Sequence, residues 1–170
     1  AEAGGLYGYI DITGNYVIPP KYKHAWTICE GIGRYFDGYS YGYIKVEADG
    51  NYNKITKLGQ AIYPIAGDFS EGLAYVQEPA GLFGYIDKSG NYAISPKFAY
   101  ASSFSDGLAV AQKDNLFGYI DKHGNFQIQP EYDFASDFSN GVATVWKSGF
   151  MYFINKQNKK IYQASFQQIK

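Results

Sequence analysis

Three aspartates recur in the phrase Asp-x-x-Gly, which is also a spacing seen in calcium-binding loops. Asp11, Asp87 and Asp121 each precede a glycine by three residues. Calcium needs about six to eight oxygen ligands, whereas each phrase supplies one carboxylate. The same spacing suits a tight turn, in which an aspartate carboxylate accepts hydrogen bonds from turn amides. We therefore expect turns at these aspartates, with no metal site and no cofactor.

Histidine and cysteine offer few further candidates for catalysis. The chain has two histidines, His24 and His123, and one cysteine, Cys29. A single cysteine excludes an intrachain disulfide and a cysteine-based metal cluster. His123 lies in one of the Asp-x-x-Gly phrases, and Cys29 takes the place of a turn serine in similar segments. No nucleophile stands beside a base in the pattern that covalent catalysis uses, so we predict that the chain is not an enzyme.

Charge and composition narrow the class of protein further. Fifteen Lys and Arg against 16 Asp and Glu leave a net charge of −1, which argues against a nucleic-acid partner. No run approaches the roughly 18 apolar residues of a membrane span, so we expect no membrane insertion. The 18 Tyr, 12 Phe and 20 Gly residues favour strands joined by tight turns. The composition therefore predicts an all-β chain.

The chain is a series of repeats, each beginning with one recurring phrase. The segment 84–92, Gly-Tyr-Ile-Asp-Lys-Ser-Gly-Asn-Tyr, returns almost unchanged at 118–126. Earlier versions begin at Gly8 and Gly42, and a degraded one covers 152–156. The spacing between successive copies is 34 residues, except that the second copy carries eight more. Such a period indicates stacked repeats.

A second phrase, Phe-Ser-x-Gly-Leu-Ala, follows the first in fixed order. It is clearest at 69–74 and 104–109, and weaker at 28–33. We divide residues 1–170 into a single repeat domain with these copies: 6–39, 40–81, 82–115, 116–149 and a degraded terminal copy, 150–170. The extra residues of the second copy lie between Lys45 and Ile65, where we expect a longer protruding loop.

These two phrases resemble the WG-repeat, or KWG-repeat, family of bacterial proteins. The tryptophan that names the family is replaced in every copy: Tyr7, Tyr41, Phe83, Phe117 and Met151. The resemblance implies repeats found in surface, exported or multi-domain bacterial proteins, and it implies no catalytic residue. On this basis we expect an exported or cell-surface protein, with the cytoplasm as the alternative.

Each repeat reads as a β-hairpin followed by a return strand. The turn after Asp121 suits a type I turn with a G1 bulge, and Gly124 suits its left-handed position. If Asp121 faces Asn125, the hairpin pairs Gly118 with Ile128, and we expect an aromatic side chain of a neighbouring repeat to fill the gap at the glycine. Prolines such as Pro130 are expected to end the second strand.

Repeats of two or three strands are marginal alone, so they must stack to bury a core. The degraded last copy resembles a terminal cap. We therefore predict an open twisted β-array of about 34-residue repeats, with a propeller-like ring as the alternative.

Repeated aromatic residues are the candidates for binding. Tyr9, Tyr43, Tyr85 and Tyr119 hold one position in successive repeats and form a predicted ladder, which suits sugar stacking or a protein interface. The alternative is that they pack between stacked repeats. Trp26 and Trp146 are off-consensus and serve as further binding candidates or as caps.

Two function classes follow from this pattern. The first is a non-catalytic protein–protein interaction or scaffold module, with an unidentified protein partner. The second is a carbohydrate or cell-envelope binding module, with a cell-surface glycan as its ligand. Open array edges also allow self-association.

Overall fold

The computed structural model describes residues 1–11, 13–46 and 55–164, and this part of the chain consists of strands and turns. None of the described residues belongs to a helix that could cross a membrane. The strands form five small antiparallel sheets, which we number 1 to 5 in chain order. No sheet closes on itself, and the chain is an open all-β repeat array as predicted.

Sheet 1 has three strands and the other sheets have four each, in sequential order. The strands of sheets 1 and 2 are β1 (Glu2–Ala3), β2 (Leu6–Ile10), β3 (Tyr16–Tyr22), β4 (His24–Cys29), β5 (Ile32–Phe36), β6 (Tyr41–Val46) and β7 (Ile55–Tyr63). Those of sheet 3 are β8 (Ile65–Ala66), β9 (Leu73–Gln77), β10 (Phe83–Asp87) and β11 (Tyr92–Phe98). Those of sheet 4 are β12 (Tyr100–Ala101), β13 (Ala109–Lys113), β14 (Leu116–Ile120) and β15 (Phe126–Tyr132). Those of sheet 5 are β16 (Phe134–Ala135), β17 (Val142–Lys147), β18 (Phe150–Asn155) and β19 (Lys160–Ala164).

Each of sheets 2 to 5 combines strands from two sequence repeats. In sheet 4, the return strand β13 comes from the third repeat, and it pairs with β14, the first hairpin strand of the fourth repeat. The short strand β12 adds to the outer side of β13. Sheet boundaries are therefore offset from the repeat boundaries, and every return strand pairs with the hairpin of the following copy.

The hairpin turns have the chemistry expected from the sequence. The Asp121 carboxylate accepts hydrogen bonds from the amides of His123 (2.9 Å) and Asn125 (3.0 Å). Gly124 has a φ of 77°, in the left-handed region that glycine tolerates. The terminal copy keeps this turn with different residues, because Asn155 accepts the amide hydrogen bonds and Asn158 takes the left-handed position at a φ of 59°.

The register of the hairpin differs from the predicted one at its glycine. Ile128 pairs with Tyr119 and not with Gly118, because the register shifts between Ile120 and Tyr119, and a second shift follows between Tyr119 and Phe117. A Cβ atom on Gly118 would lie 2.4 Å from the carbonyl oxygen of Ile128. The expectation of an aromatic side chain in this gap was therefore wrong, since the backbone of the partner strand fills it.

The prolines also lie elsewhere than predicted. Pro130 lies inside β15 (Phe126–Tyr132) and not at its end, and its nitrogen lies beside Gly118 at the bulge. Strand β15 is the outer strand of sheet 4. An outer strand tolerates proline because one side of it needs no hydrogen-bond donors, so the strand continues past the proline.

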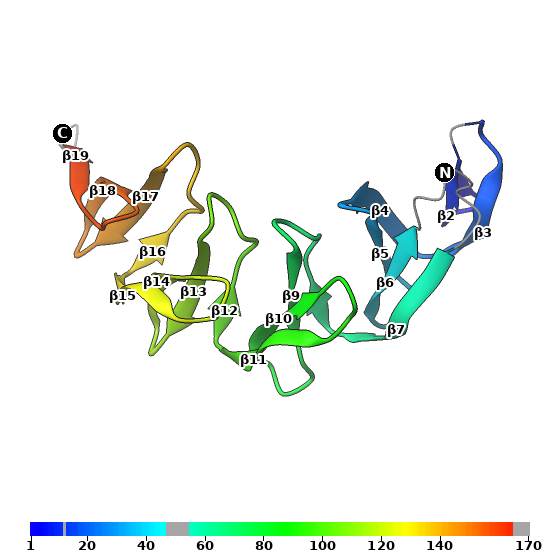
Figure 1. Ribbon diagram of the computed structural model, residues 1–170, viewed down its shortest axis with the longest axis horizontal. Coiled ribbons are helices and arrows are strands. Elements are labelled where there is room, and N and C mark those ends of the chain that lie inside the picture. Colours follow the sequence, from blue (N-terminus) through cyan, green and yellow to red (C-terminus); the bar gives the residue numbers. More distant parts are fainter. Residues whose placement is uncertain (12, 47–54, 165–170) are drawn as a thin grey trace, which may run out of the picture.

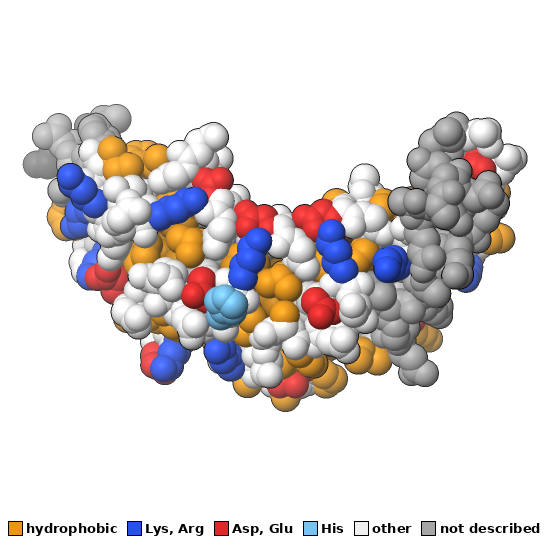
Figure 2. All heavy atoms as spheres, in the orientation of Figure 1, with side chains coloured by type: hydrophobic (Ala, Val, Ile, Leu, Met, Phe, Trp, Pro, Cys, Tyr) orange, Lys and Arg blue, Asp and Glu red, His pale blue; other side chains and the backbone are white. Residues whose placement is uncertain are grey.

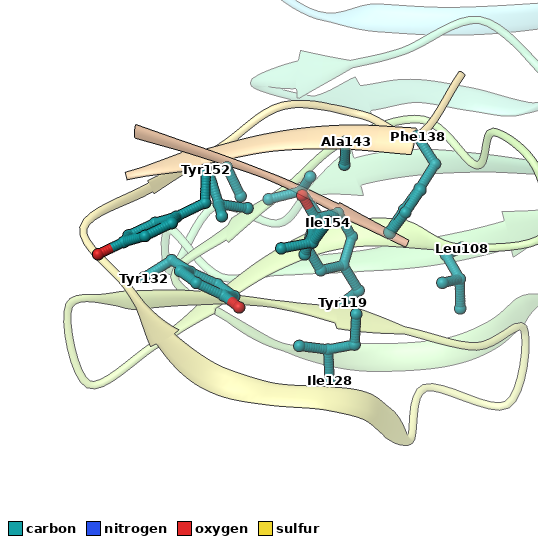
Figure 3. Close-up of a cluster of buried hydrophobic side chains, with 11 residues drawn as sticks. Leu108, Tyr119, Ile128, Tyr132, Phe138, Ala143, Tyr152 and Ile154 are labelled. Atoms are coloured by element: carbon teal, nitrogen blue, oxygen red, sulfur yellow. The ribbon is translucent and has the colours of Figure 1, made fainter. Parts of the chain in front are cut away.

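The sheets follow one another along an arc, with the two chain ends at opposite ends of the row (Figure 1). Four clusters of buried hydrophobic residues lie between successive sheets. The cluster between sheets 4 and 5 joins Tyr119 and Ile128 of one sheet to Phe138 and Ile154 of the next (Figure 3). The core is therefore formed between repeats, as stacking requires.

A row of polar contacts also links successive repeats. The side chains of Glu30, Glu71 and Asp106 accept hydrogen bonds from glycine amides one repeat further on: Gly72 (3.0 Å), Gly107 (3.0 Å) and Gly141 (2.7 Å). Lys88 and Lys122 pair with the two glutamates at 2.8 and 3.1 Å. Basic and acidic side chains lie side by side along the hollow edge of the arc (Figure 2). The expected protruding loop falls largely on residues 47–54, outside the described residues.

Candidate interaction surface

The four repeated tyrosines do not lie on a surface. Tyr43, Tyr85 and Tyr119 are at most 1% exposed and Tyr9 is 7% exposed. Each hydroxyl donates a hydrogen bond to a backbone carbonyl of the adjacent sheet: Tyr9 to Arg34 (2.8 Å), Tyr43 to Gly67 (2.6 Å), Tyr85 to Ser102 (2.7 Å) and Tyr119 to Ser136 (2.8 Å). Their interpretation as an exposed stacking ladder is thus corrected, and they pack between repeats.

A phenylalanine of the second phrase packs against Tyr43, Tyr85 and Tyr119. The ring centroids of Tyr85 and Phe104 lie 4.9 Å apart, and those of Tyr119 and Phe138 lie 4.6 Å apart. Burial of the phenol raises the pKa of Tyr85 and Tyr119 well above its usual value. These tyrosines remain protonated donors and tie one sheet to the next.

The residues considered for catalysis or metal binding are not brought together. His24 and Cys29 lie at opposite ends of β4, which spaces them by about 16 Å at the usual rise of a strand. His123 is exposed in its turn, and its amide bonds Asp121. Within the described residues, no group of three His, Cys, Asp or Glu side chains is placed to hold a metal ion.

A different set of aromatic side chains forms a continuous row across sheets 3, 4 and 5. Neighbouring ring centroids in this row are 5.3 to 6.3 Å apart. We call the set the aromatic row, and its members are Tyr75, Phe83, Tyr100, Phe117, Phe134 and Trp146. Tyr100 is 43% exposed and Phe134 is 51% exposed.

The row could have been found only in part from the sequence. Phe83 and Phe117 take the place of the family's tryptophan, and Trp146 was a candidate from its off-consensus position. Tyr100 and Phe134 directly precede Ala101 and Ala135, in the segments that link each hairpin to its return strand. The sequence of these segments does not indicate that the two rings are exposed. The residues are brought together because β12 and β16 each lie at the start of a new sheet, against the hairpin of the preceding one.

The other tryptophan, Trp26, lies in a filled site between sheets 2 and 3. The Arg34 guanidinium carbon lies 4.1 Å from the centroid of the Trp26 ring and 5.5 Å from that of Tyr41. The Nε of Arg34 donates to the Asp68 carboxylate at 2.8 Å, and a terminal guanidinium nitrogen of Arg34 donates to the carbonyl of Ala66. Trp26 also lines a separate cavity of about 410 Å³ together with Tyr7 and Ile28.

An open cavity of about 390 Å³ lies within the aromatic row. Its lining residues are Tyr100, Val110, Phe117, Phe134, Ala135, Ser136 and Asp137, and we call it the Asp137 pocket. Asp137 is exposed. Burial raises the pKa of the Tyr100 phenol, and the charge of Asp137 raises it further. The pocket therefore combines aromatic walls with one accessible carboxylate.

Comparison with solved structures finds likenesses of low identity. A structure of KlHsv2 with loop 6CD replaced by a Gly-Ser linker is 13% identical, with a TM-score of 0.48, and the match covers 77% of this chain and 47% of that chain. The WD40 beta propeller domain of Doa1 is 10% identical, with a TM-score of 0.44, and the match covers 86% of this chain and 54% of that one. The chain thus spans about half the length of these two structures.

Comparison of sequences gives a definite assignment. No curated protein matches the sequence. The family model for the WG containing repeat matches residues 7–37, 83–117 and 117–149, which is more than half of the chain and includes copies of both recurring phrases. The protein therefore belongs to the WG-repeat family.

Proposed function

We propose that this chain is a non-catalytic interaction module that binds a protein partner along the aromatic row. The observation that carries the proposal is the continuity of the row, from Tyr75 in sheet 3 to Trp146 in sheet 5, with Tyr100 and Phe134 about half exposed. Aromatic residues are enriched at protein interfaces and dominate their binding energy. A partly exposed row of aromatic side chains on a repeat array is thus suited to an extended partner surface.

The same row favours a protein over a carbohydrate. The carbohydrate alternative depended on Tyr9, Tyr43, Tyr85 and Tyr119, whose rings are buried. Three of the six members of the row are phenylalanines, which lack the polar tip that makes tyrosine suitable for contact with sugar hydroxyls. We therefore place the carbohydrate class second.

Selection from a peptide library, run beside a glycan array, tests this proposal. We expect peptides to bind the wild-type chain and to lose at least tenfold in affinity, about 1.4 kcal/mol, with Tyr100→Ala/Phe134→Ala. The control is Tyr39→Ala, which removes a side chain that is 91% exposed outside the row. Circular dichroism confirms that the variants fold. Glycan binding without peptide binding, or peptides indifferent to the double variant, would overturn the proposal.

Self-association through sheet edges is less well supported than binding of another protein. The outer strands β11 and β15 each contain a proline, Pro96 or Pro130, which lacks the N–H that an added strand would bond. We therefore propose a monomer, for which sedimentation equilibrium should give a mass near 19.0 kDa. The exported or cell-surface location remains part of the proposal, and cell fractionation tests it.

A further inference from the structure

We propose that the Asp137 pocket binds an arginine side chain of the protein partner. This inference rests on the proposed function and names the residue type that anchors the partner. An equivalent site between sheets 2 and 3 is filled by an arginine of this chain, Arg34, which pairs with Asp68.

The two sites occupy equivalent places in the repeat. Arg34 pairs with Tyr43 across β5 and β6, and Val110 pairs with Tyr119 across β13 and β14. Tyr43 donates to the carbonyl of Gly67, the residue before Asp68. Tyr119 donates to the carbonyl of Ser136, the residue before Asp137. Val110 therefore stands where Arg34 stands, and Asp137 where Asp68 stands.

The side chains at these places explain why one site is filled and the other open. The Arg34 side chain extends between sheets 2 and 3 and reaches the Asp68 carboxylate. Val110 is too short to reach across, and a cavity of about 390 Å³ remains beside it. Among the described residues, no side chain donates a hydrogen bond to the Asp137 carboxylate or forms an ion pair with it. At the equivalent place between sheets 3 and 4, Tyr75 stands where Arg34 stands and Ser103 stands where Asp68 stands, and neither residue is charged at neutral pH.

The lining of the pocket matches the chemistry that holds Arg34. Phe117 occupies the place of Tyr41, one of the rings that face the Arg34 guanidinium. Ser102 replaces Trp26, and the exposed rings of Tyr100 and Phe134 supply other walls. Asp137 offers the carboxylate, to which a planar guanidinium can donate two parallel hydrogen bonds. Aromatic faces attract the same cation.

Arginine is preferred over lysine for two reasons. A guanidinium stacks on aromatic rings and forks onto a carboxylate at the same time, whereas an ammonium acts as a compact, strongly hydrated point charge. Arg34 uses both contacts in this chain, with the Trp26 ring on one side and Asp68 at its tip. A lysine analogue should therefore bind the pocket more weakly than an arginine analogue.

The direct test is NMR titration of the whole chain with N-acetyl-arginine methylamide. We expect saturable shifts of the Val110, Ala135 and Asp137 amide resonances, with a dissociation constant at or above about 1 mM. The lysine and citrulline analogues should bind at least about tenfold more weakly. Asp137→Asn should weaken arginine binding at least about tenfold. Asp114→Asn, which changes an exposed aspartate outside the pocket, should leave it unchanged.

Equal binding of the arginine and citrulline analogues would overturn the inference, as would unchanged binding in Asp137→Asn or the absence of saturable shifts. The outcomes separate it from the proposed function. Library peptides that need Tyr100 and Phe134 but neither arginine nor Asp137 would leave the interaction module intact and refute the arginine pocket. Binding of the arginine analogue with no library peptide selected would support the arginine pocket and refute the interaction module.

A second variant tests the internal comparison. Val110→Arg should place a guanidinium against Asp137, as Arg34 lies against Asp68, and so abolish binding of the arginine analogue. Addition of Asp137→Asn should lower the melting temperature of Val110→Arg more than that of the wild-type chain, because only the variant loses an ion pair. If the two melting temperatures fell equally, the equivalence of the two sites would be wrong.

Discussion

At the scale of single residues, the recurring tyrosine connects two successive sheets through its buried ring and its hydroxyl. In the sequence alone, the same residue was a candidate for binding. Tyr85 faces sheet 4 and Ile86 faces sheet 2, so neighbouring residues of β10 belong to two different clusters of buried residues. The prediction of an exposed tyrosine ladder was wrong, because sheets packed on both sides leave a central strand with no exposed face. The alternative, packing between stacked repeats, is what the structure has.

Loss of one tyrosine hydroxyl should weaken the contact between two sheets. Tyr85→Phe keeps the ring against Phe104 but leaves the buried carbonyl of Ser102 without its donor. We expect the free energy of unfolding to fall by about 1 kcal/mol, measured by urea denaturation. Tyr39→Phe, at a side chain that is 91% exposed, is the matched control and should change nothing. Equal stability of the two variants would contradict this role.

The glycine before each tyrosine should be intolerant of any side chain. A Cβ atom on Gly84 would lie 2.6 Å from the carbonyl oxygen of Ile94 and 2.7 Å from the nitrogen of Pro96. Because backbone atoms cannot move aside cheaply, Gly84→Ala should destabilise the chain by about 2 kcal/mol. Ser95→Ala, at an exposed residue of the partner strand, should change the urea midpoint little. A tolerated Gly84→Ala would show that the bulge can relax.

At the scale of elements, the hairpin is the part of the repeat most directly readable from the sequence. Asp at the turn entry and Gly three residues later encode the turn chemistry, and both act as predicted in three hairpins. The bulge and the internal proline were missed because the predicted register paired the two hairpin strands residue by residue. Such a register has no place for an extra residue on one strand. The strands β1, β8, β12 and β16 were missed because two residues give no pattern.

The turn carboxylate should be replaceable by an amide but not by a methyl group. Asn155 already accepts the turn amides in the terminal copy, so Asp121→Asn should remain close to the wild-type chain at neutral pH. Asp121→Ala removes the acceptor and should destabilise the chain by about 1 kcal/mol. Thermal unfolding of both variants checks this order, and equal loss in the two would contradict it.

The stability of Asp121→Asn should depend on acid pH less than that of the wild-type chain. Burial opposes ionisation of Asp121, but hydrogen bonds from the Asn125 and His123 amides outweigh it and lower the pKa of the carboxyl group. A lowered pKa adds stability above the unfolded-state value near 4, and this stability is lost as the pH falls further. Asp121→Asn should therefore lose less stability than the wild-type chain below about pH 4.

At the scale of the whole molecule, stability lies in the boundaries between sheets. Each of the four boundaries holds one hydrophobic cluster and one buried tyrosine of the recurring phrase. The period of the sequence predicted the stacking and the open array. It could not predict the offset between sheets and repeats, because a periodic sequence looks the same from any starting point.

Alkaline pH should loosen all the boundaries together. Burial raises the pKa of Tyr43, Tyr85 and Tyr119, and burial with the charge of Tyr35 raises that of Tyr22 to about 12. The unfolded chain releases these protons near pH 10. The contribution of these tyrosines to the free energy of unfolding should therefore be steady from neutral pH to about pH 10 and fall as the pH rises above it. Urea midpoints across this range, read with tyrosinate absorbance, check the sign; ionisation of every tyrosine before unfolding would contradict it.

The offset between sheets and repeats has a consequence for how such a chain can change length. Since each return strand pairs with whichever hairpin comes next, duplication or loss of one whole copy at any point restores every pairing across the junction. Unequal recombination within the gene can therefore lengthen or shorten the array while keeping the same strand pairing at every junction, and the number of sheets can evolve one copy at a time.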